Sequence, residues 1–389
     1  MASYIPYGRQ DINQQDIDAV VEVLKSDWLT QGPVVPQFEE KIAQYCGAAN
    51  AVAVNSATSA LHIACLALGL GPGDWLWTSP NTFVASANCG LYCGAQVDFV
   101  DIDPSSYNMC VIALEEKLVK AEQEGCLPRI VIPVHFAGQP CDMQSIGKLA
   151  QRYGFKVIED ASHAIGARYR NVPIGNCRYS DITVFSFHPV KIITTGEGGM
   201  ALTNDVQIAR RMQILRSHGI TRDAEEMTCA PDGPWYYQQI DLGFNYRMTD
   251  IQAALGLSQM QRLDEFVTKR HAIAKRYDEL LADFPVVTPW LHSDNYSALH
   301  LYVVRLNLTK VAKTHRDVFE GLRAADIGVN LHYIPVYRQP YYTDMNFKPR
   351  LCPEAEQYYS EAISLPIYPA LTEVEQDQVV TALQMVTNP

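Results

Sequence analysis

The stretch FSFHPVKIITTGEGGM, Phe185–Met200, decides how we interpret this chain. The apolar run Asp181–Phe187 predicts a buried strand, and Pro189 interrupts regular structure two residues before Lys191. A glycine cluster, GEGG, follows, and an apolar strand resumes over Met200–Thr203. We therefore expect the lysine between two strands in a glycine-lined pocket. Desolvation there would lower its pKa and make the amine a nucleophile suited to a Schiff base. On this stretch alone, an ordinary surface lysine on a loop remains the simpler alternative.

The composition indicates a globular protein of one large or two ordinary domains. The chain has 389 residues, of which 48% are hydrophobic, and a formal net charge of −12. This charge argues against a nucleic-acid partner or an anionic membrane held by bulk charge, and no apolar run is long enough to span a membrane. The 10 scattered cysteines and an N-terminus unlike a signal peptide predict a cytoplasmic protein with reduced thiols. We expect no metal, because Cys89 and Cys93 are better explained as buried helix cysteines.

Short apolar runs alternate with helical stretches through the first two thirds of the chain. This alternation predicts right-handed βαβ units and a mostly parallel sheet, and therefore an α/β fold. Ligands of such sheets gather at the carboxyl ends of the strands. The predicted strands are Ala51–Asn55, Trp75–Ser79, Val97–Val100, Ile130–His135 and Lys156–Glu159.

Two polar features follow predicted strands directly. The segment Ser56–Ser59 lies between a strand and a helix, so free backbone N–H groups at the helix N-terminus could bind a phosphate. Asp160 ends another strand, where its carboxylate could face a cationic ring nitrogen. Both features have a simpler explanation as helix N-caps, because Ser, Thr and Asp are common there.

The pattern changes in the last third of the chain. A long amphipathic helix, Ile251 to about Phe284 and broken once, is of the kind that joins a large domain to a smaller one. Shorter elements follow, with strands predicted at His300–Leu308 and Val329–Tyr333. We therefore divide the chain near residue 260, into a large domain of residues 1–260 and a small C-terminal domain of residues 261–389.

Six motifs in the same order resemble one enzyme family over almost the whole chain. The family is the DegT/DnrJ/EryC1/StrS sugar aminotransferases, a branch of the fold-type I enzymes that use pyridoxal 5′-phosphate (PLP). The resemblance implies a seven-stranded, mostly parallel sheet flanked by helices, with a small α+β C-terminal domain. The motifs are NSATSALH (Asn55–His62), SPNTFVAS (Ser79–Ser86), EDASHAIGA (Glu159–Ala167), FSFHPVKIITTGEGG (Phe185–Gly199), GFNYRM (Gly243–Met248) and LHYIPVY (Leu331–Tyr337).

The resemblance also implies roles for particular residues around the cofactor. Lys191 would form the Schiff base and move the proton between substrate and cofactor, and Asp160 would pair with the pyridine nitrogen. His163 matches the position beside the ring hydroxyl, which is often Gln in relatives, and Phe83 matches the aromatic residue that stacks on the ring. The implied phosphate ligands are Ala57, Thr58, Ser186 and, from the other subunit, Asn245.

A homodimer with shared active sites is therefore implied. The substrate contacts implied by the resemblance are Tyr7, Thr30, Gln31, Gly32, His332 and Tyr333. Within the family, LTQGP, FSFHPVK, ITTGEGG and HYIPVY are most similar to aminotransferases of pseudaminic acid biosynthesis. The implied substrate is a UDP-linked 4-keto-6-deoxy-N-acetylhexosamine, with L-glutamate as the amino donor.

Three alternatives stay open. The first is transamination of another nucleotide 4-keto sugar, of the perosamine or aminoarabinose type. The second is a non-catalytic binding or regulatory protein with the same fold, which the intact Lys191 argues against. The third is a nicotinamide-dependent enzyme, which is disfavoured because no glycine-rich dinucleotide fingerprint follows the first strand.

Overall fold

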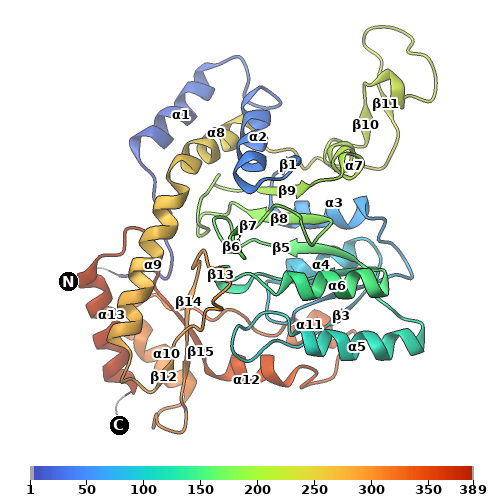
Figure 1. Cartoon of the computed structure of the whole chain (residues 1–389). Helices are drawn as coiled ribbons and strands as arrows, with labels where there is room; N and C mark the ends of the chain where they lie inside the picture. The colour runs from blue at the N-terminus through green and yellow to red at the C-terminus, as the bar shows by residue number, and fades with distance from the viewer. Residues whose placement is uncertain (1–3, 388–389) are drawn as a thin grey trace.

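The computed structural model describes residues 4–387, and a seven-stranded sheet forms its centre (Figure 1). Strand β9 runs antiparallel to both of its neighbours, β1 and β8, and the other pairs in the sheet are parallel. The predicted mostly parallel, seven-stranded sheet is therefore confirmed. In spatial order the strands are β1 (Asn50–Val54), β9 (Gly199–Thr203), β8 (Ile182–Ser186), β5 (Lys156–Asp160), β4 (Ile130–Ile132), β2 (Trp75–Thr78) and β3 (Gln96–Phe99).

Helices cover both faces of this sheet, so its strands are apolar on both sides. In β1, Ala51 and Ala53 pack into the core on one face, while Val52 and Val54 pack into the core on the other. The first face is covered by α2 (Val34–Cys46), α5 (Val111–Glu124) and α6 (Met143–Tyr153), and the second by α3 (Ala57–Ala67), α4 (Ala85–Tyr92) and α7 (Val206–Arg216).

The predicted long helix is present and is broken once, as α8 (Asp250–Gln259), a 3₁₀ turn at Met260–Arg262 and α9 (Leu263–Leu280). The N-terminal helix α1 (Gln14–Lys25) packs against α8, where Asp16 accepts hydrogen bonds from Ser258 and Gln259 and pairs with Arg262.

Beyond α9, a second core forms around a three-stranded antiparallel sheet of β12 (Val286–Val287), β14 (Tyr302–Leu306) and β15 (Ala362–Leu365). Helices α10 (His315–Ala324) and α13 (Glu373–Thr387) also contribute to this core. Ile5, near the N-terminus, belongs to it as well and bridges to Ile327. The division into domains at residue 260 stays a prediction.

The remaining elements are short. Strands β13 (Asn295–Tyr296), β6 (Arg168–Tyr169) and β7 (Val172–Pro173) form a small antiparallel sheet, and α11 (Pro340–Thr343) and α12 (Pro353–Glu361) precede β15. Between residues 4 and 387, no helix is both long and apolar enough to cross a bilayer. Cys89 lies buried in α4, and Cys93 is buried at the C-terminal cap of that helix.

One sequence prediction of local structure was wrong because of a long-range contact. The strand predicted at Val329–Tyr333 is irregular, and so is the segment 79–84, which follows β2 and precedes α4. The two segments bind each other instead: the backbone N–H of Tyr333 donates to Asn81 Oδ1 (3.0 Å), and that of Val336 donates to the Pro80 carbonyl (3.0 Å). Contacts between segments so distant in sequence cannot be read from local patterns.

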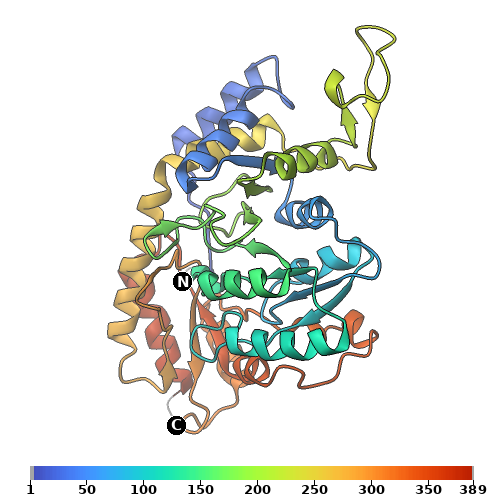
Figure 2. The ribbon, with the colours of Figure 1, turned by 45° about the vertical axis from the view of Figure 1, so that its right-hand side comes forward.

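A projecting arm occupies the segment 220–242 (Figure 1). Short strands β10 (Ile220–Thr221) and β11 (Gln238–Gln239) pair at its base, and the rest extends away from the sheet in both views (Figures 1 and 2). Two large apolar side chains on this arm are exposed to solvent, Trp235 (74% exposed) and Leu242 (76% exposed).

Candidate active site

A cavity of about 980 Å³ lies at the carboxyl ends of the central strands. It is lined by Ser56 after β1, Asp160 at the end of β5, Ser186 at the end of β8 and Lys191 on the β8–β9 connection. The fold thus brings these four residues to one sheet edge, as is usual for ligands of open α/β sheets.

Lys191 lies partly buried in this cavity on a tightly bonded connection. Its backbone N–H donates to the His188 carbonyl (2.9 Å). The Phe187 carbonyl accepts from the Thr194 hydroxyl (2.9 Å) and from the Thr195 backbone N–H (3.0 Å), which closes the loop behind the lysine. Desolvation lowers the pKa of Lys191 to about 8, and the Asp160 carboxylate opposes this shift. About a tenth of the amine is therefore neutral and nucleophilic at pH 7, far more than for an ordinary lysine.

Asp160 is held by two hydroxyl groups. The Ser86 hydroxyl donates to Oδ2 (2.6 Å), and Ser162 donates to Oδ1 from its hydroxyl (2.6 Å) and from its backbone N–H (3.1 Å). These contacts fix the carboxylate in an orientation at the cavity wall. A carboxylate held in this way could keep a ring nitrogen protonated.

The N-terminus of α3 also lines the cavity. The Ser56 hydroxyl caps the helix by accepting from the Ser59 N–H (3.1 Å). The preceding N–H groups, of Ala57 and Thr58, belong to the first turn and have no intrahelical acceptor. Strand β9 runs so close to this turn that a Cβ added at Gly199 would lie only 2.5 Å from the Ala57 nitrogen. The site therefore has the backbone donors and the confined space that suit a phosphate.

We expect Gly199→Ala to weaken binding of PLP, the cofactor that the resemblance implies, by about tenfold or more, because the added methyl group must displace the Ala57 backbone. PLP affinity is measured by fluorescence titration of the cofactor-free protein, and stability by thermal unfolding. Gly71→Ala is the matched control, since a Cβ at Gly71 meets nothing within 4 Å. Equal affinities of the two variants would contradict this role of the β9–α3 contact.

Three buried histidines surround Lys191 and are kept neutral. Burial, reinforced by the lysine charge, lowers the pKa of His163 and His300 well below the usual value and that of His332 to about 3. Rings of His163 and His300 lie 4.4 Å apart. The Nδ1 atoms of both are buried and have no hydrogen-bond partner among residues 4–387. Both nitrogens are enclosed by protein atoms, so it is other parts of these rings that line the cavity.

Aromatic side chains line the mouth of the cavity. Phe83 is 60% exposed there, as an aromatic residue that stacks on a ligand would be before the ligand binds. Tyr7 packs against the ring of His332 (5.5 Å between centroids), and Tyr333 packs against Phe83 (6.5 Å). The structure thus places all of the proposed cofactor and substrate residues in this cavity apart from one loop and one asparagine.

Those exceptions lie elsewhere on this chain. Asn245 is exposed at the base of the projecting arm, where it bridges to Ser217. The Thr30, Gln31, Gly32 loop is attached to the start of α8: Thr30 bridges to Thr249, and the Gly32 N–H donates to Asp250. None of these residues lines the cavity, so their proposed roles stay predictions.

Sequence reasoning missed several residues that the fold brings to the site. Ser86 and Ser162 hold Asp160, and Asn81 holds the Tyr333 backbone. All three lie inside motifs already singled out, so the motifs gave a signal without assigning a role. His300 is the first residue of a predicted strand, and nothing in the neighbouring sequence marks it as a site residue.

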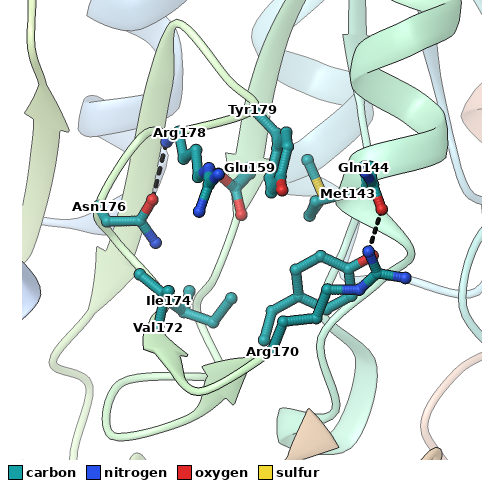
Figure 3. Close-up of a pocket in the computed structure, with 10 residues that line it drawn as sticks. Met143, Gln144, Glu159, Arg170, Val172, Ile174, Asn176, Arg178 and Tyr179 are labelled. Carbon is teal, nitrogen blue, oxygen red and sulfur yellow. Dashed lines mark hydrogen bonds between the residues drawn. The ribbon is translucent and has the colours of Figure 1, made fainter. Parts of the chain in front are cut away.

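A second, smaller cavity of about 210 Å³ lies beside strand β5, and Figure 3 shows its lining, which includes Glu159, Arg170 and Arg178. Successive strand residues point to opposite faces, so Glu159 faces away from Asp160. The buried Glu159 carboxylate accepts from the Thr183 hydroxyl (3.1 Å) and contacts His135 Nε2 (2.7 Å). This cavity holds no lysine, and its carboxylate is fully bonded. We therefore assign Glu159 a structural role, in which its hydrogen bonds hold strand β5 in place, and no catalytic role.

The fold and the main cavity define a PLP-dependent aminotransferase. The model of the DegT/DnrJ/EryC1/StrS aminotransferase family matches residues 10–384, and the chain belongs to that family. It is thus a sugar aminotransferase, and the lysine, the held carboxylate and the free helix N-terminus fit PLP. The family, fold class, enzyme class and cofactor expected from the motifs are confirmed.

Individual relatives cover almost the whole chain. The spore coat polysaccharide biosynthesis protein SpsC of Bacillus subtilis is 39% identical over 98% of this chain and 96% of its own. Helicobacter pylori PseC, an aminotransferase involved in pseudaminic acid biosynthesis, superposes with a TM-score of 0.90 at 30% identity, covering 99% of each chain. The sugar aminotransferase Spr1654 of Streptococcus pneumoniae, solved in its PMP form, gives 0.89 at 28% identity, covering 98% of this chain and 99% of that one.

Proposed function

We propose that this protein transfers an amino group from L-glutamate to C4 of a UDP-linked 4-keto-6-deoxy-N-acetylhexosamine, in the cytoplasm, as a step of pseudaminic acid biosynthesis. The observation that carries the aminotransferase chemistry is the partly neutral Lys191 amine beside the held Asp160 carboxylate. The similarity to PseC over 99% of both chains supports the choice of sugar.

Each residue of the cavity has a defined task in this proposal. When bound, PLP supplies the electron sink of the reaction. The N–H groups of Ala57 and Thr58 bind its phosphate, and Asp160 keeps the proton on its ring nitrogen. Lys191 Nζ accepts a proton from the donor's α-carbon and later returns one to C4 of the sugar. An amine with a pKa near 8 can do both, because neither protonation state is strongly favoured.

A second candidate is transamination of a different nucleotide 4-keto sugar. The observation that favours it is the higher identity to SpsC, 39% against 30% for PseC. SpsC is described as acting in spore coat polysaccharide biosynthesis, and its description names no sugar. Sugar specificity depends on a few side chains at the cavity mouth, so overall identity does not decide between the two.

The deciding experiment offers purified protein a panel of nucleotide 4-keto sugars, each generated in place by a dehydratase, with L-glutamate. We expect a 4-amino product by mass spectrometry with the UDP-linked N-acetyl sugar, and equimolar 2-oxoglutarate. Turnover only of keto sugars lacking the 2-acetamido group would favour the second candidate. Failure of every keto sugar, with 2-oxoglutarate still released from glutamate, would leave PLP chemistry intact and refute both sugar assignments.

We further propose a homodimer in which Asn245 completes the partner's phosphate site. Asn245 is exposed and lies outside the cavity of its own chain, at the base of an arm with bare apolar side chains. Both features suit a surface that a second copy covers.

Mixing two inactive variants tests this arrangement. Random exchange of Lys191→Ala and Asn245→Ala subunits gives mixed dimers with one intact site only if Asn245 acts across the interface. We expect recovery of about a quarter of wild-type activity. No recovery from subunits shown by mass spectrometry to have exchanged would place Asn245 in its own chain's site or in none.

A further inference from the structure

Arg270, on helix α9, is a buried cation. No carboxylate among residues 4–387 compensates for its charge, and burial lowers its pKa to about 9, so the guanidinium group still carries that charge at neutral pH. Burial of a charge without a counter-ion is unfavourable, so hydrogen bonds must offset it. The groups that accept those hydrogen bonds therefore show what this side chain does in the fold.

The acceptors are three backbone carbonyl groups. Arg270 Nη1 donates to the carbonyls of Leu299 (3.2 Å), His300 (3.2 Å) and Ile367 (3.0 Å). In an extended strand, successive carbonyls point in opposite directions, so one nitrogen can reach those of Leu299 and His300 only because the chain turns there. Leu299 has a φ of +48°, in the left-handed region that leucine rarely adopts.

This turn at Leu299 brings His300 to the cavity. The Ala298 N–H donates to the Gly138 carbonyl (3.0 Å), and a Cβ at Gly138 would lie 2.9 Å from both the Leu299 nitrogen and the His163 carbonyl oxygen. His300 lines the cavity, and its ring lies 4.4 Å from the ring of His163. A strained residue keeps its conformation only where its surroundings hold it, and Arg270 binds the carbonyls of this turn.

The third acceptor connects Arg270 to another part of the cavity wall. The Ile367 N–H donates to the Tyr7 carbonyl (3.1 Å), and Tyr7 lines the cavity. One guanidinium group thus joins α9 to the segments that carry His300 and Tyr7. A planar group with donors in fixed directions suits such a junction, whereas a lysine ammonium is a point charge on a flexible stem.

The charge of Arg270 acts on the same histidine ring. Burial lowers the pKa of His300 well below the usual value, and the charges of His163, Lys191, Arg270 and His332 lower it further. Burial also keeps the pKa of His163 low. Two neutral imidazole rings can pack together at this distance, whereas two charged rings would repel each other.

We propose that Arg270 is a positioning residue for transamination, which holds the turn at Leu299 so that His300 supports His163 beside the cofactor. The resemblance places His163 next to the ring hydroxyl of PLP and implies no role for Arg270 or His300. This inference rests on PLP binding and on the half-reaction with the amino donor, and it is independent of which sugar is used.

The direct test is NMR of the full-length, PLP-loaded protein labelled at the histidine rings, with the His300 signal assigned through His300→Asn. In the wild type we expect no titration of His300 between about pH 5.5 and pH 8. In Arg270→Met the ring should be released, and its midpoint should rise toward the ordinary value of about 6.5. An unchanged His300 signal in folded Arg270→Met would overturn the proposal.

Two further variants separate this role from a loss of stability. Tyr277→Phe is the matched control, because it removes a buried hydrogen bond from the same helix to the Pro366 carbonyl (3.0 Å) and leaves the turn at Leu299 untouched. Its melting temperature should fall while the His300 signal stays in place. Arg270→Lys keeps the charge and should fold even if Arg270→Met does not. We expect a His300 midpoint above that of the wild type, and an unmoved midpoint would refute the proposal.

A double-mutant cycle on the half-reaction with glutamate gives a second test. We expect Arg270→Met to lower the maximal rate about tenfold, measured by stopped-flow loss of the PLP absorbance band, and to have no further effect in the His300→Asn background. An equal loss in both backgrounds, or a wild-type rate in His300→Asn, would show that Arg270 does not act through His300. If glutamate fails to react even with the wild type, the donor assignment is wrong, and the NMR result alone decides this inference.

Discussion

Lys191→Ala is expected to lower kcat for transamination by at least about 10³-fold, since the change removes both the nucleophile and the proton carrier. The absorbance band of covalently attached PLP should also disappear. Lys156→Ala is the matched control, because Lys156 pairs with Asp181 at an exposed site outside the cavity. Steady-state kinetics and absorbance spectra of both variants check this. A variant that kept the band and a tenth of wild-type activity would show that another amine binds PLP.

The pH dependence of PLP uptake should report the lysine directly. Desolvation lowers the pKa of Lys191 from 10.5 to about 8, so the uptake rate of the cofactor-free protein should rise with pH and level off above about 8. The same pKa shift affects the free energy of unfolding. Between about pH 8 and pH 10.5, Lys191 is protonated in the unfolded chain but mostly neutral in the folded one. Stability of the cofactor-free protein should therefore increase with pH across that interval from this group. Stopped-flow absorbance measures the uptake rate. A midpoint of its pH dependence near 10.5 would show that burial does not lower the pKa of Lys191.

Asp160→Asn should lower kcat by about 10²–10³-fold, because a neutral amide cannot hold the positive charge on the ring nitrogen. Asn keeps nearly the same shape, so we expect binding of PLP to persist while both half-reactions slow. The half-reaction with glutamate can be followed alone, as loss of the PLP absorbance band in a stopped-flow instrument.

Asp294→Asn is the control for this change. Asp294 pairs with Arg170 at an exposed position outside the cavity, so its loss should leave the half-reaction unchanged. Near-normal rates in Asp160→Asn would mean that the carboxylate is not the partner of the ring nitrogen. Loss of PLP binding together with activity would instead indicate that Asp160 mainly maintains the wall that Ser86 and Ser162 form with it.

The sequence predicted those parts of the site that are local. Lys191 lies between a strand and a glycine cluster, and Asp160 ends a strand, so the alternation of elements alone brings them to one edge of the sheet. The sheet itself was predictable because its strands are apolar on both faces. The resemblance then supplied roles that spacing could not.

The rest of the site depends on contacts between distant segments. The segment around Tyr333 reads as a strand, yet its N–H groups bond to residues some 250 positions earlier, at Pro80 and Asn81. The contact between Tyr333 and His163, and the place of His300 beside His163, arise only after the C-terminal part packs on the sheet. No local pattern of the chain contains that information.

The attachment of residues 333–336 to residues 80–81 couples two parts of the cavity wall that lie far apart in the sequence. Tyr333 and Phe83 both line the cavity, so a shift of either segment must break these two hydrogen bonds or carry the other segment with it. The amino donor and the sugar react in turn at the same Lys191, so an excess of either should compete with the other.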